Sequence, residues 1–204
     1  MVYLDNQYDV LVDYMRDLAE KFILRYLPPK PEEGPEIYGL DVRSYCLLAH
    51  AALEEFFENI AIHVMHESVI CFLKGNLRRP LLSIISHAKN RLRVDEVNDI
   101  NEQTVFDCTR NILDDFKSQF SKEVYDNHGT SIDCLRKILM PVYINIPDNV
   151  NWRNSLKQLT KDRGSIAHKQ VVDRIPSPED VYTYVKDCLK MAKNVRDQAK
   201  RLLR

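Results

Sequence analysis

Apolar residues recur along this chain at intervals of three and four, the spacing that predicts amphipathic α-helices. In residues 5–26 the apolar positions are Tyr8, Leu11, Met15, Leu18 and Phe22. This predicted helix ends at Leu27, because two prolines follow directly and proline cannot continue a helix. The proline-rich stretch behind it predicts a rigid surface connection within a domain.

Residues 41–74 are apolar around most of a helical circumference, a pattern typical of a central helix. The last helix is predicted to begin at Ser177-Pro178-Glu179-Asp180, with a cap, a proline at the first helical position and acids in the first turn. Residues 142–150 form the only β-like stretch. Further helices are predicted at 80–92 and 103–126, from Thr130 to before Pro141, and after a cap at Asp148 or Asn149.

Length and composition agree with a helical bundle. The chain has 204 residues, 45% of them hydrophobic and 29% charged, which suits one domain with a core and argues against disorder. Its five glycines are too few for the many tight turns of a strand-rich protein. We therefore predict a single all-α domain over residues 1–204, an up-and-down helical bundle with an extra region of short helices and loops.

The sequence also favours a cytoplasmic location without a membrane partner. No apolar run is expected to reach the ~18–20 residues that span a bilayer, and the first residues are acidic where a signal peptide is basic. The five cysteines are odd in number and widely spaced, without a C-x-x-C pair. They predict buried free thiols in a reducing compartment.

A formal net charge of -1 excludes a uniformly basic nucleic-acid coat protein, but the basic residues are clustered. No acid lies between Glu67 and Asp95, and the block 153–169 contains Asp162 as its single acid. Solvated helix faces would explain this segregation. The alternative is a phosphate-binding surface, whose affinity falls steeply with salt. The basic residues are Lys74, Arg78, Arg79, Lys89, Arg91 and Arg93; Arg153, Lys157, Lys161, Arg163 and Lys169; and, in the last helix, Lys186, Lys190, Lys193, Arg196, Lys200, Arg201 and Arg204.

Most common catalytic motifs are missing, among them a glycine-rich phosphate loop, H-E-x-x-H, G-x-S-x-G and C-x-x-C. His63 and His66 have a metal-binding spacing, but the sequence places no third ligand beside them. Glutamates are concentrated in only one helical turn, residues 54–58. A di-metal site in a helical bundle needs metal-binding turns on several helices. Glu54 can instead pair with His50 one turn away. We predict no metal and no cofactor.

The strongest candidate site is the R-x4-H segment from Arg163 to His168, at the end of a predicted amphipathic helix. Arginine is permanently charged and binds phosphate oxygens in a bidentate manner, and histidine transfers protons near neutral pH. Residues five apart on a regular helix are offset by ~140°. Either the helix breaks near Gly164, then, or another subunit completes the site. A purely structural alternative pairs Arg163 with Asp162 and leaves His168 at the helix end.

These residues resemble the HEPN superfamily of helical domains, many of which are metal-independent ribonucleases, and within it the RiboL-PSP-like and related stand-alone prokaryotic branches. The resemblance rests on the late R-x4-H motif, on Ile166-Ala167 before the histidine, and on the segment Ala51–Glu58 of the central helix. The order of the helices is similar over most of the chain, but the specific motif is only six residues long. It implies a HEPN-type bundle and a homodimer whose two motifs share one cleft.

The resemblance also implies an activity, that of an endoribonuclease in a prokaryotic defence or toxin system, with an antitoxin or defence partner. RNA would be cut to a 2′,3′-cyclic phosphate and a 5′-hydroxyl. Arg163 would hold the scissile phosphate and His168 would act as acid or base, with Lys161 and Lys169 as flanking RNA contacts.

Two residues depart from the family pattern. Gly164 replaces the polar residue that usually follows the arginine, and Gln170 replaces a tyrosine that some branches use for modification. The main alternative is therefore a non-catalytic module that binds RNA or nucleotide, or docks on a partner protein. A third hypothesis is a structural helical protein whose charged faces are solvated.

Overall fold

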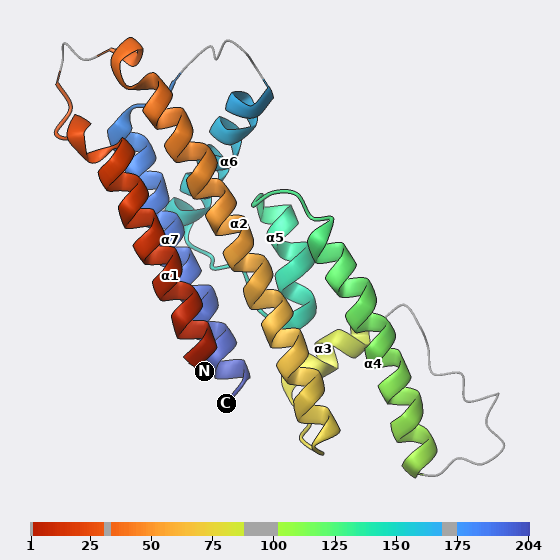
Figure 1. Cartoon of the computed structure of the whole chain (residues 1–204). Coiled ribbons are helices and arrows are strands. Elements are labelled where there is room, and N and C mark those ends of the chain that lie inside the picture. Colours follow the sequence, from red (N-terminus) through yellow and green to blue (C-terminus); the bar gives the residue numbers. More distant parts are fainter. Residues whose placement is uncertain (1, 31–33, 88–101, 169–174) are drawn as a thin grey trace.

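A computed structural model describes residues 2–30, 34–87, 102–168 and 175–204 (Figure 1). Within these ranges the chain is built from α-helices and short 3₁₀ turns and contains no strand, so the all-α prediction is confirmed. The elements are α1 (Val2–Phe22), η1 (Leu24–Tyr26), α2 (Pro35–Leu73), α3 (Arg79–His87), α4 (Glu102–Tyr125), α5 (Ile132–Leu139), η3 (Met140–Val142), α6 (Val150–His168) and α7 (Pro178–Leu202).

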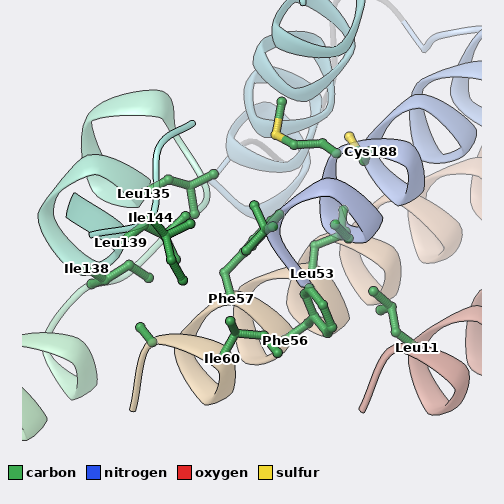
Figure 2. Close-up of a cluster of buried hydrophobic side chains, with 14 of the residues drawn as sticks. Leu11, Leu53, Phe56, Phe57, Ile60, Leu135, Ile138, Leu139, Ile144 and Cys188 are labelled. Atoms are coloured by element: carbon green, nitrogen blue, oxygen red, sulfur yellow. The ribbon is translucent and has the colours of Figure 1, made fainter. Parts of the chain in front are cut away.

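The long helix α2 forms the centre of the bundle. It contacts α1, α6 and α7 as well as α3, α4 and α5, and α1 and α7 lie side by side so that the chain ends meet at one end of the molecule (Figure 1). Figure 2 shows Leu11 of α1, Leu53 and Phe57 of α2, Leu135 of α5 and Cys188 of α7 in one shared core. The apolar circumference read from the sequence therefore reflects burial on several sides.

The expectation that no segment is apolar enough to cross a bilayer is wrong for α2, which qualifies by length and composition alone. Its central position gives a physical reason for this composition. Buried residues such as Tyr45, Leu53 and Met65 span more than half of the circumference of α2 and are covered by the neighbouring helices. A core helix surrounded in this way has the same composition as a membrane span.

Helix ends agree with the sequence where the capping is local. Asn149 Oδ1 accepts a hydrogen bond from Trp152 N at 3.1 Å, and Ser177 Oγ accepts one from Asp180 N at 3.1 Å. The cap of α5 is Ser131 and not Thr130, since Ser131 Oγ accepts from Cys134 N at 3.2 Å. The side chain of Thr130 is directed to other partners, described below.

Three predicted boundaries differ from the structure. The central helix begins at Pro35 and not at 41, because proline is well placed at a first helical position. The β-like stretch after Val142 forms no strand; Ile144 fills the core from a loop instead. Helix α3 is described to His87, and residues 88–92 of its predicted range lie outside the described residues.

Candidate functional site

Helix α6 carries both residues of the R-x4-H motif and is helical from Val150 to His168. Gly164 lies within it, and a Cβ added there would meet nothing within 4 Å. Of the two alternatives, a helix that breaks near Gly164 is therefore ruled out, and packing against the described residues does not require a glycine there. On a regular helix Arg163 and His168 leave the axis in directions ~140° apart.

Arg163 is half-buried, and its guanidinium has no hydrogen bond or ion pair among the described residues. The structural alternative pairs it with Asp162, but Asp162 Oδ1 accepts a hydrogen bond from Gln158 Nε2 at 2.9 Å. Asp162 also lies close enough to Cys46 to help burial raise the pKa of that thiol to about 12. Arg163 thus keeps a positive charge without a carboxylate partner in the described part of the chain.

A buried polar cluster joins three elements beside Arg163. His50 of α2 is 1% exposed, and its Nε2 lies 3.0 Å from Thr130 Oγ1 in the loop between α4 and α5. Thr130 Oγ1 in turn lies 3.2 Å from Thr160 Oγ1 of α6. Glu54, one turn after His50, accepts a hydrogen bond from the backbone N–H of Gly129. Through Thr160 the cluster links α6 to α2, one helical turn before Arg163.

The charge of Arg163 acts on this cluster. Burial, together with the charge of Arg163, lowers the pKa of His50 to about 4, so the imidazole is neutral at neutral pH. The predicted pairing with Glu54 is right in position, with His50 Nδ1 3.8 Å from Glu54 Oε2. A neutral ring at this distance forms neither an ion pair nor a good hydrogen bond. Arg163 is thus the cation whose charge acts on His50.

Glu58 lies one turn farther along α2 and is also perturbed. Burial, followed by the carboxylates of Glu54 and Glu55, raises the pKa of Glu58 to about 7. A carboxyl group that titrates near neutrality is one mark of a functional site, although packed helices produce such shifts too.

The other predicted site residues are less fully described. His168 is the last residue of α6, and its side chain lies outside the described part of the structure, as does the whole of Lys169. Lys161 is exposed on α6. Among the described residues, no group of three or more His, Cys, Asp or Glu side chains could hold a metal ion. The rings of His63 and Tyr3 are in contact, with centroids 4.3 Å apart and planes tilted by 30°, and burial lowers the pKa of both His63 and His66.

Sequence reasoning missed His50 as a neighbour of Arg163. A signal was present, because His50 shares the buried side of the central helix with Cys46, Leu53 and Phe57. A histidine on such a face needs a polar partner from another element. Which element supplies that partner depends on packing between helices far apart in the sequence.

Comparison with known proteins agrees with the resemblance drawn from the motif. No curated protein and no solved structure matched the chain. The family described as RiboL-PSP-HEPN matches residues 16–201, a span that contains the central helix and the R-x4-H segment. Since this match covers most of the chain, the protein belongs to the RiboL-PSP-HEPN family.

Proposed function

We propose that this protein is a metal-independent endoribonuclease that acts in the cytoplasm as part of a prokaryotic defence or toxin system. The observation that carries the proposal is the guanidinium of Arg163. It is half-buried at the end of α6, lacks a partner among the described residues, and lies beside an imidazole that stays neutral. A cation held in this way suits a phosphate, and the HEPN family supplies RNA as the substrate class.

The proposed reaction needs one cation and one proton carrier. The 2′-oxygen of RNA attacks the adjacent phosphorus, the bond to the 5′-oxygen breaks, and the products are a 2′,3′-cyclic phosphate and a 5′-hydroxyl. Arg163 stabilises the charge that develops on the non-bridging oxygens. His168 takes the proton from the 2′-hydroxyl or gives one to the leaving 5′-oxygen. Lys161 and Lys169 contact the flanking phosphates.

The regular course of α6 supports a dimeric site. Because Arg163 and His168 leave one helix ~140° apart, a single helix does not readily present both to one phosphate. A two-fold dimer would bring Arg163 of one copy near His168 of the other. The open space beside Gly164 would leave room for the backbone of the second copy. A defence or antitoxin protein that restrains the enzyme belongs to the same proposal.

The test is RNA cleavage in EDTA with chemical analysis of the product ends. Wild type is compared with Arg163→Ala and His168→Ala, and with Arg110→Ala and His87→Ala as exposed controls. We expect cyclic phosphate ends from wild type and both controls, and at least a ~100-fold loss of rate in the two motif variants. Equal cleavage by His168→Ala, with an unchanged circular dichroism spectrum, would refute the assignment.

A second function is favoured by one residue, Gly164, which replaces the polar residue that usually follows the arginine in the family. If wild type binds RNA but never cuts it, the protein is the non-catalytic HEPN module. Loss of that binding in Arg163→Ala would then locate the binding site at the same motif.

A further inference from the structure

Two basic segments that are far apart in the sequence meet at one end of the bundle. Arg78 and Arg79 lie at the start of α3, while Arg201 and Arg204 lie at the end of α7. All four line one cleft of about 700 Å³, together with Tyr143. This is the end of the molecule where α7 finishes, opposite the end toward which the last turns of α6 run (Figure 1).

The four arginines differ from most basic residues of α7 in having no partner among the described residues. Lys200 and Arg196 both bind Asp5, at 2.7 Å and 3.6 Å, and Lys190 binds Asp187 at 2.8 Å. By contrast, Arg78, Arg79, Arg201 and Arg204 have no hydrogen bond or ion pair among the described residues, and no acid is among the residues that line their cleft.

This difference separates the cleft from the rest of the basic residues of α7. The basic residues of α7 from Lys186 to Lys200 are explained by solvent exposure and by pairing within the chain. At the end of α7 four arginines without a partner among the described residues share one concave surface with residues of the α2–α3 connection. Their positive potential adds up in that cleft and favours the binding of an anion there.

Tyr143 adds an aromatic ring to the cleft. It is 47% exposed and has a left-handed backbone, with φ 64°, an uncommon conformation for a bulky residue. Its neighbours Val142 and Ile144 are both fully buried, so they fix the backbone while the ring of Tyr143 faces outward. Two hydrogen bonds between Asn145 and Gln198, at 3.0 and 2.8 Å, attach the same loop to α7. The ring is thus held on an anchored loop.

We propose that this cleft binds single-stranded RNA, with phosphates on the four arginines and a base stacked on Tyr143. Arginines that follow a backbone, combined with an aromatic side chain for stacking, are the features by which proteins bind single strands with little sequence preference. A duplex would not offer an unstacked base to Tyr143. A concave surface also fits a strand better than it fits a flat anionic membrane.

The cleft lies far from Arg163. His50, beside Arg163, and Leu73, the last residue of α2 before the cleft begins at Gly75, are separated along α2 by about 35 Å. The choice of RNA as the ligand rests on the proposed function. The cleft would add a second site at which the enzyme holds its substrate. Such a remote site lowers the KM for long RNA and leaves kcat almost unchanged.

The test uses fluorescence anisotropy with a labelled single-stranded RNA, over a range of salt concentrations. The protein is the full chain carrying His168→Ala, which prevents cleavage during titration. We expect the double variant Arg78→Gln/Arg201→Gln to bind more weakly and to reduce the slope of log K against log salt by about 1.4, since two phosphate contacts are lost. The matched control is Arg110→Gln/Arg136→Gln, two exposed arginines outside the cleft, which should bind like the parent.

Tyr143 is tested by two substitutions. Tyr143→Phe keeps the ring and should bind normally, whereas Tyr143→Asn tolerates the left-handed backbone, removes the ring, and should weaken binding by about 5- to 100-fold. Wild-type binding and salt slope in both the arginine double variant and Tyr143→Asn would overturn the inference. So would loss of binding to anionic phospholipid vesicles in the double variant while RNA binding is unchanged.

The two proposals fail in different ways. If wild type does not cut RNA but the cleft variants still lose RNA binding, the proposed nuclease fails and the cleft remains. If wild type cuts RNA, and the same cleft substitutions made without His168→Ala bind and cleave long RNA with an unchanged KM, the nuclease remains and the cleft inference is wrong.

Discussion

Replacing Gly164 by alanine tests the description of α6 most directly. The added Cβ meets nothing within 4 Å, and the residue is helical with no positive φ. Steric cost is therefore absent, and the gain is the difference in helix propensity, about 0.8–1 kcal/mol in favour of alanine. For a chain of this size a change of ~1 kcal/mol raises Tm by about 2–4 °C.

The matched control is the same substitution at Gly129. Here a Cβ also has room, with Cys134 Sγ 4.0 Å away, but φ is +127°, a region that side chains rarely adopt. Gly129→Ala should therefore destabilise the fold by about 1–3 kcal/mol. Replacement of glycine by alanine thus changes the free energy of unfolding in opposite directions at two glycines that both have room for a Cβ. The difference comes from the backbone conformation alone.

The assay is urea unfolding followed by circular dichroism, at protein concentrations where sedimentation shows monomer. Destabilisation by Gly164→Ala under these conditions would refute the description of Gly164 as a helical residue facing open space. The same variant also probes the proposed dimer. If a second copy packs its backbone against Gly164, alanine should stabilise the monomer and yet weaken dimerisation and RNA cleavage.

Three further predictions follow from named contacts. The pKa of His50 is about 4 in the folded state against 6.5 for the free side chain, so protons bind the unfolded state first as pH falls from 6.5 to 4. Over that range wild type should lose on the order of 3 kcal/mol of unfolding free energy relative to His50→Gln in parallel urea titrations, and identical pH profiles would contradict the burial of a neutral His50. In Arg163→Ala the pKa of His50 should rise, because one cause of its depression is removed, and NMR titration of the imidazole would show no change if the two groups were far apart. Ser177→Ala should cost about 1 kcal/mol through loss of the cap on Asp180 N, whereas Ser177→Asp should retain most of the stability in the same thermal melts.

Local sequence determined the helices and several of their ends. Spacing of apolar residues located the main helices, and the caps at Asn149 and Ser177 form hydrogen bonds to backbone three residues away. Such bonds depend on a few neighbouring residues, so they can be read without knowledge of the fold. The same holds for the R-x4-H spacing, which led to the family that residues 16–201 match.

Only the tertiary structure decided which of these local features lie together. The stretch after Val142 has the composition of a strand, but no second strand is available in the described chain, and burial of Ile144 makes it an anchored loop. The neighbour of Arg163 is His50, more than 100 positions earlier, and Arg78 shares a cleft with Arg201. These pairings arise because α2 is covered on several sides, so that residues from separate helices are brought together by burial of apolar surface. Periodicity along one helix identifies its buried face, but not the helix that will cover it.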